Sequence, residues 1–160
     1  MAASPVLANQ HIAVGIEGMR NNRNSEPYVV LSTDDKPIDQ LSGAVVGVVD
    51  MLGRDEMQKL VEKTLRVQGV KTKLVTKLED LLSLLLFSSA DAVLVGESAV
   101  QPFQQRSRLP LKVREVPDSR LGLPAVGILN PRVKDAIASA IVGMSGELSR
   151  MLGVDRWRVG

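Results

Sequence analysis

Two short turns contain the residues of this sequence whose types and spacing could do chemistry. The first, Gly53-Arg54-Asp55, follows an apolar run and begins a helical pattern. A glycine turn at a helix N-terminus exposes backbone N–H groups that favour an anion, and a guanidinium can pair with that anion directly. The turn could therefore hold a phosphate or a carboxylate. Alternatively, the glycine only makes the turn, and Asp55 and Glu56 only favour the first helical turn electrostatically.

The second turn is Gly96-Glu97-Ser98, which follows the apolar run of residues 91–95. Open α/β sheets bind ligands at the edge where such strands end. Glu97 could accept a hydrogen bond from a cationic or hydroxylated ligand, or it could be a second first-turn acid. Both turns together are the candidate ligand-binding site.

The other polar groups form no recognisable catalytic or metal-binding pattern. His11 is the only histidine, and Asp34, Asp35 and Asp118 are turn acids, which need a partner in space before they indicate catalysis or a metal. Cysteine is absent, and so are the phosphate-loop, dinucleotide, zinc-protease and serine-hydrolase motifs. The sequence therefore predicts no enzyme, no cofactor and no metal.

The composition is that of an ordinary globular protein. It is 44% hydrophobic and 24% charged, and 160 residues suffice for one domain with its own core. The net charge of +2 is a mixture of both signs and aromatic residues make up only 2%, which argues against a nucleic-acid partner.

The compartment stays open at this stage. We expect no membrane span, because no stretch reaches the roughly 18 apolar residues that a bilayer requires. Residues 1–10 lack the basic region of a signal peptide. The protein is cytoplasmic as the chain stands, or periplasmic if an export signal has been removed.

Strands and helices must hold the two turns in place, and the hydrophobic pattern predicts them. Apolar runs at residues 44–49 and 91–95 indicate buried strands, each followed by a helical pattern. Two strand–turn–helix units in succession imply right-handed crossovers. We therefore predict an α/β fold with a mixed, mainly parallel sheet flanked by helices. Further strands are expected at residues 11–16, 28–33, 72–76 and 124–129, an edge strand at 111–116, and an apolar core helix at 78–88.

The C-terminal region predicts one long helix. Asn130 and Pro131 are a strong start signal, and Gly153 ends the pattern. Gly143 and Gly146 allow close packing or mark a break. The predicted organisation is a flexible arm at residues 1–10, a single domain at 11–155 and a tail at 156–160.

Four stretches, in this order, resemble the second half of the phosphate/phosphonate-type substrate-binding proteins of ABC importers. Residues 28–43 resemble the family's hinge strand and the turn after it, and residues 44–50 resemble the strand before its ligand turn. Residues 91–95 and 124–154 resemble a later strand and the returning strand with the C-terminal helix. The resemblance covers residues 28–155. It implies the type II periplasmic-binding-protein fold, two α/β lobes joined by hinge strands, and non-catalytic binding of a small anion.

The sequence departs from this family in two ways. Family members are much longer, and no first lobe is recognisable here. Members also place serine or threonine after the first strand, whereas this turn reads Met51-Leu52-Gly53-Arg54-Asp55 and has no hydroxyl group. Arg54 could compensate by pairing with the anion.

Three functions remain open. The chain could be a module that binds a small anion such as phosphate or phosphonate, a protein-interaction or assembly module that has lost its ligand, or an effector-sensing domain of a regulator. The glycine turns favour the first, and the missing hydroxyl groups favour the second. Because residues 124–129 and 133–151 are strongly apolar, we also expect a homo-oligomer or a protein partner through the C-terminal helix.

Overall fold

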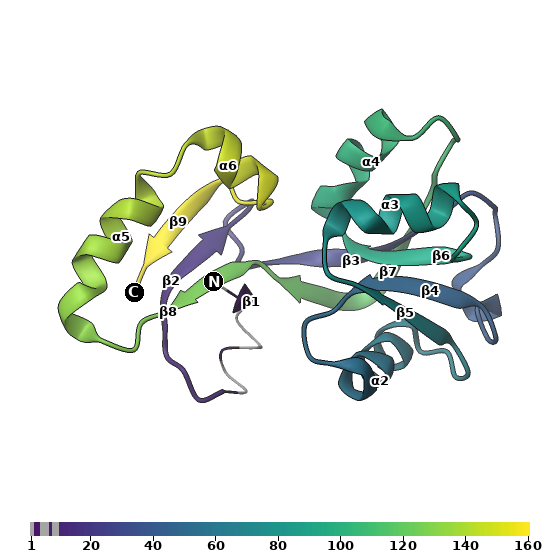
Figure 1. The fold of residues 1–160 in the computed structure, drawn as a ribbon, viewed down its shortest axis with the longest axis horizontal. Coiled ribbons are helices and arrows are strands. Elements are labelled where there is room, and N and C mark those ends of the chain that lie inside the picture. The colour runs from purple at the N-terminus through teal and green to yellow at the C-terminus, as the bar shows by residue number, and fades with distance from the viewer. Residues whose placement is uncertain (1, 4–6, 8–9) are drawn as a thin grey trace. The chain divides into compact units, whose positions relative to one another are not determined.

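The computed structural model describes residues 2, 3, 7 and 10–160, which form two compact units. Unit 1 comprises Met1–Glu26 and Arg120–Gly160, and unit 2 comprises Pro27–Ser119. The chain passes from one unit to the other inside two strands, β3 (Ser25–Ser32) and β7 (Lys112–Gly122) (Figure 1). The predicted single domain over residues 11–155 thus includes parts of both units.

Unit 2 is built on a five-stranded sheet with the order β5-β4-β6-β3-β7. Its inner strands β4 (Val45–Val49) and β6 (Ala92–Gly96) pair in parallel, and β4 also pairs in parallel with β5 (Lys71–Val75). β3 pairs antiparallel with β6, so the sheet is mixed. The α/β prediction is confirmed, and β7 lies at an edge, as the alternation of its side chains predicts.

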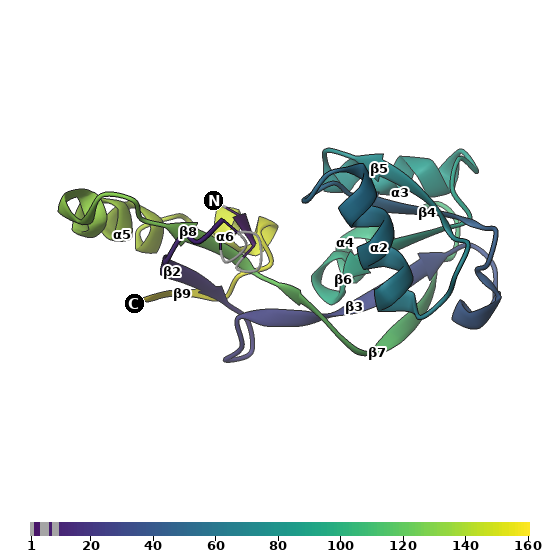
Figure 2. The ribbon, with the colours of Figure 1, turned by 90° about the horizontal axis from the view of Figure 1, so that it is seen from below.

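Helices cover both faces of this sheet. α2 (Arg54–Leu65) lies on one face, and α3 (Leu78–Leu86) and α4 (Val100–Arg106) lie on the other (Figures 1 and 2). Two short 3-10 turns, η1 (Ile38–Gln40) and η2 (Glu97–Ala99), complete the unit. α2 buries one stripe, because its apolar residues recur at helical spacing. That stripe is Met57, Val61 and Leu65.

The opposite face contains the main apolar cluster. Val29, Val93 and Val95 of the sheet pack there with Leu81 and Leu85 of α3. Gly47 lets α3 approach β4 closely, because a Cβ atom at this position would lie 2.9 Å from Leu84. The leucine-rich sequence of α3 suggests a helix that is covered on all sides, but only one face of it is fully buried. Phe87, just after it, is 80% exposed.

Unit 1 has a four-stranded antiparallel sheet with the order β1-β8-β2-β9. β2 (Val14–Met19) is central, between β8 (Pro124–Gly127) and β9 (Arg156–Val159). Most of the tail expected at residues 156–160 therefore forms a strand, β9. In the expected arm, Ala2–Ala3 form β1, whereas residues 1, 4–6 and 8–9 lie outside the described residues.

The predicted single C-terminal helix is wrong, because the structure divides it into a 3-10 turn and two helices. η3 (Pro131–Val133) leads into α5 (Lys134–Val142), and α6 (Gly146–Met151) follows. Gly143 ends α5, and Ser145 caps α6 by accepting a hydrogen bond from the Leu148 amide at 3.2 Å. Serine stabilises a helix at the N-cap but not in the helix interior. Ser145 therefore favours a new helix start over one continuous helix.

Side chains fasten β9 to the rest of unit 1. Arg158 donates hydrogen bonds to the Glu17 carboxylate across the β2–β9 pair, and Arg158 lowers the pKa of Glu17. The Trp157 indole donates to the Ser149 hydroxyl at 3.3 Å. In the described part of the chain, no helix combines the length and apolar character needed to cross a bilayer.

Candidate functional site

The turn after β4 is held by its own aspartate. The Asp50 carboxylate accepts a hydrogen bond from the Gly53 amide at 2.8 Å. Gly53 has φ +88° and ψ 163°, a conformation that is essentially restricted to glycine. No atom lies within 4 Å of where its Cβ would be, so this side of the turn is open.

The first turn of α2 has unpaired backbone donors. Its first intrahelical hydrogen bond runs from the Met57 amide to the Gly53 carbonyl at 2.9 Å, and no side chain caps the helix. The amides of Arg54, Asp55 and Glu56 therefore have no partner among the described residues. Such amides carry the positive end of the helix dipole and favour an acceptor with negative charge.

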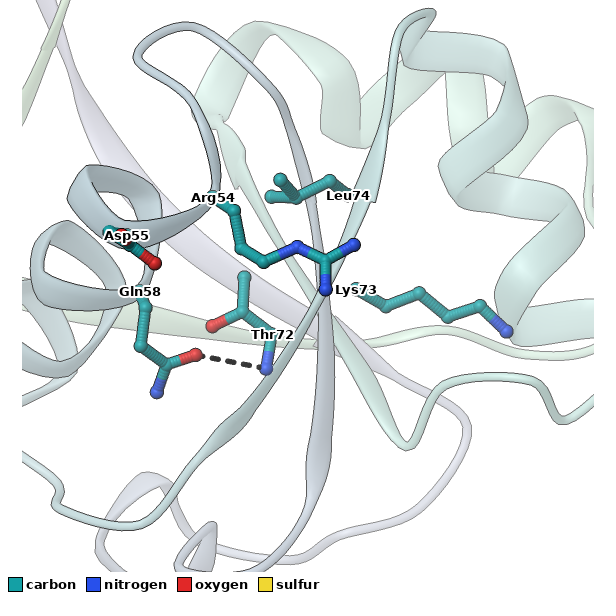
Figure 3. A pocket seen from close by; sticks show the side chains of 6 residues that line it. All are labelled: Arg54, Asp55, Gln58, Thr72, Lys73 and Leu74. Atoms are coloured by element: carbon teal, nitrogen blue, oxygen red, sulfur yellow. Dashed lines mark hydrogen bonds between the residues drawn. The ribbon is translucent and has the colours of Figure 1, made fainter.

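An open recess of about 490 Å³ lies between this helix start and β5 (Figure 3). α2 contributes Arg54, Asp55 and Gln58 to its lining. β5 contributes three consecutive residues, and the side chain of Lys73 points away from the α2 residues. The lining thus offers a guanidinium, a carboxylate and polar groups, with a single apolar side chain. The three residues of β5 are Thr72, Lys73 and Leu74.

Gln58 fixes the position of α2 against β5. Its side-chain amide donates to the Val70 carbonyl at 2.6 Å, and its side-chain oxygen accepts from the Thr72 amide at 3.3 Å. The Thr72 hydroxyl is buried and has no hydrogen-bond partner among the described residues. A buried hydroxyl group without a partner is costly, so the site has one unused polar group at its base.

The second predicted turn lies at the same edge of the sheet. β4 and β6 are parallel neighbours, with Val46 opposite Ala92, so their carboxyl ends point the same way. Gly96 is buried at the end of β6, Glu97 is exposed and Ser98 is half-buried. None of these three residues lines the recess.

Sequence reasoning identified Arg54 and Asp55 but missed the other lining residues. Gln58 follows Arg54 at the i,i+4 spacing, which places both on one helix face, and this was the available signal. The β5 residues gave no signal, since their place beside α2 depends on which strand β4 pairs with.

The comparisons with known proteins place the fold. No protein-family model and no curated protein matches the sequence. Solved structures do match. The substrate-binding protein of an amino acid ABC transporter aligns at a TM-score of 0.55 with 17% identity, over 93% of this chain and 71% of that chain.

Two further structures agree. The protein Tv2483 bound to L-arginine aligns at a TM-score of 0.60 with 17% identity, over 93% of this chain and 62% of its own. The periplasmic VFT2 domain of Bordetella pertussis BvgS aligns at 0.57 with 16% identity, over 91% and 62%. The chain therefore has a periplasmic-binding-protein-like fold and spans 62% to 71% of these chains.

The three neighbours have different descriptions. One is described as a substrate-binding protein, one as a protein bound to L-arginine and one as a periplasmic domain. Two of the three name amino acids, and none of the three names phosphate or phosphonate. At these identities the likeness concerns the fold.

Proposed function

We propose that the chain is a non-catalytic solute-binding module whose ligand binds at the start of α2. The observation behind the proposal is the uncapped first turn of α2, which presents three unpaired amides and Arg54 beside an open recess. Backbone donors at a helix start and a guanidinium are suited to a carboxylate or a phosphate. The periplasmic-binding-protein-like fold supports the same role.

The charges of the turn favour a zwitterionic ligand over phosphate or phosphonate. Asp50 and Asp55 flank Arg54, while Glu56 is engaged by Lys59 at 3.0 Å. A dianion would be repelled by the carboxylates of Asp50 and Asp55, whereas an amino acid can place its carboxylate at Arg54 and its ammonium near Asp55. We therefore propose an amino acid as the ligand, the class of ligand that two of the structural neighbours are described with.

The test is a thermal-shift panel of amino acids, phosphate, phosphonate and sulfate with the full chain. A ligand at a hundred times its Kd stabilises the folded state by about 2.7 kcal/mol, which raises the melting temperature. Arg54→Ala should remove the shift without changing the melt of the free protein. Lys63→Ala is the matched control, because Lys63 is an exposed cation in the last turn of the same helix. No shift with any millimolar ligand would exclude solute binding at this turn.

An assembly module is the second candidate, and exposed apolar side chains of unit 1 favour it. Val142 of α5 is 56% exposed, and Leu148 and Met151 of α6 are 52% and 69% exposed. Side chains of this type are usually buried in an interface when they gather on one surface. We propose a second copy of the chain or another protein as their cover.

Two expectations from sequence remain predictions. One is that the chain lacks the first lobe of its longer relatives. The structure has two compact units and the chain spans only part of the solved chains it matches, and the missing first lobe stays a prediction. The other is the effector-sensing role, which would use the same binding turn.

A further inference from the structure

The outer edge of β5 has backbone N–H and C=O groups that form no hydrogen bond with another strand among the described residues. β5 is the last strand of its sheet and pairs only with β4 among the described residues. The Lys71 amide donates to the Ala44 carbonyl and the Val75 carbonyl accepts from the Asp50 amide, both at 2.8 Å. Successive residues of a strand present their backbone groups to opposite sides. Thr72 and Leu74 therefore present theirs away from β4.

Gln58 occupies only the beginning of this edge. Its side chain bonds the Val70 carbonyl and the Thr72 amide, as a neighbouring strand would. The Thr72 carbonyl and both backbone groups of Leu74 have no partner in the described part of the chain. The recess of about 490 Å³ is lined by this same stretch, so the groups are accessible where Gln58 stops.

We infer that this edge binds an extended, acidic peptide segment of a partner protein, which adds to the sheet as a sixth strand. Strand addition of this kind uses backbone hydrogen bonds for affinity and alternate side chains for specificity. Both proposals use the same recess, but this one depends on the backbone of β5 and the solute proposal depends on the first-turn amides of α2.

The charges of β5 exclude a second copy and favour acidic side chains. Lys71 and Lys73 are exposed on one face of the strand. Pairing two copies of β5 would set lysines against lysines, which is unfavourable and is a usual protection of edge strands. A partner strand with Glu at every second position would instead pair with them. On the other face, Asp55 and Leu74 suit an uncharged residue such as Thr.

The probe is a fluorescein-labelled, capped peptide with the sequence Gly-Thr-Glu-Thr-Glu-Thr-Gly, titrated with the full chain and followed by anisotropy. Leu74→Pro removes the outward amide but leaves the hydrogen bonds to β4, and it should weaken binding about tenfold. Leu74→Ala keeps the amide and should change binding by less than about threefold. The same peptide with Lys in place of Glu should bind at least about tenfold more weakly.

Charge reversal tests the side-chain assignment. Lys73→Glu should weaken the Glu peptide and strengthen the Lys peptide, whereas Lys63→Glu on α2 should change neither. If Leu74→Pro does not fold, two N-methylated peptides titrated with the wild-type protein give the same information. One peptide is methylated at the amides of its threonines and the other at the amides of its glutamates. Loss of affinity for only one of the two supports strand addition, because only one set of amides faces β5.

Three results would overturn the inference. They are no binding of the Glu peptide, equal affinity for the Glu and Lys peptides, and equal effects of Leu74→Pro and Leu74→Ala. Failure here leaves the solute proposal intact, because the thermal-shift panel uses no peptide. A thermal-shift panel without any shift, together with binding of the Glu peptide, would exclude the solute proposal and leave strand addition intact.

Discussion

At the scale of single residues, Gly53 determines the shape of the candidate site. Its positive φ turns the chain sharply from β4 into α2, and its amide is held by Asp50. No neighbouring atom fills the space beside its Cα. Glycine is therefore needed here for its backbone conformation and not for lack of space. A substitution at this position tests the cost of that conformation without a steric clash.

Gly53→Ala should lower the free energy of unfolding by about 1–3 kcal/mol, because alanine is strained at this φ and ψ whatever the space. Gly146→Ala is the matched control. That glycine also has open space around it, lacks a positive φ and begins α6. Its replacement should be neutral or stabilising by up to about 1 kcal/mol. Urea unfolding followed by circular dichroism measures both, and equal effects of the two substitutions would contradict the strain argument.

At the scale of elements, α3 shows how a leucine-rich helix divides into two faces. Leu81, Leu82 and Leu85 are buried against the sheet, while Ser83 is exposed and Leu84 and Leu86 are only partly buried. The i, i+1 and i+4 positions of the three buried leucines lie on one helix face, so helical spacing decides which of the six leucines are buried. Hydrophobicity alone therefore does not identify the buried face.

Leu85→Asp should unfold unit 2, and Phe87→Asp should not. Leu85 is 3% exposed, so an aspartate there loses apolar packing and buries an unpaired charge, which together cost about 4 kcal/mol or more. Phe87 is 80% exposed, so its replacement leaves the carboxylate in water. Expression yield and cooperative melting of the two variants are the measurement. A cooperatively folded Leu85→Asp protein would mean that this face of α3 is not core.

At the scale of the whole molecule, the described residues of unit 1 include more exposed large apolar side chains than those of unit 2. Unit 2 encloses its main cluster between a sheet and helices. In unit 1, both α5 and α6 keep apolar side chains exposed, and Leu129 before them is 83% exposed. Apolar surface of this kind is commonly buried in an interface, and a two-fold dimer is the commonest form.

We therefore expect wild-type protein to elute as a species heavier than its 17.3 kDa monomer in size exclusion with light scattering at micromolar concentration. Met151→Glu should restore the monomer, because Met151 is 69% exposed and a charge there would be buried only in the interface. Phe87→Asp, on unit 2, should leave the mass unchanged. A strictly monomeric wild type would remove the argument for self-association and leave only another protein as cover.

The sequence by itself determined the local elements. Residues 44–49 and 91–95 are continuous apolar runs, and such runs predict buried strands because both faces of the sheet must be covered. Gly53 and Pro131 mark where helical patterns begin, since glycine adopts turn conformations that other residues avoid and proline fixes φ at a helix start. These signals located β4, β6, α2 and the α/β class without any knowledge of contacts.

The tertiary structure decided everything that depends on partners distant in the chain. The tail at residues 156–160 becomes β9 because it pairs with β2, and Gln58 enters the site because α2 packs beside β5. The passage of β3 and β7 from one unit to the other likewise depends on strand pairing. Local sequence patterns report which face of an element is apolar, but not which other element covers it. That choice is made by the packing of the whole chain.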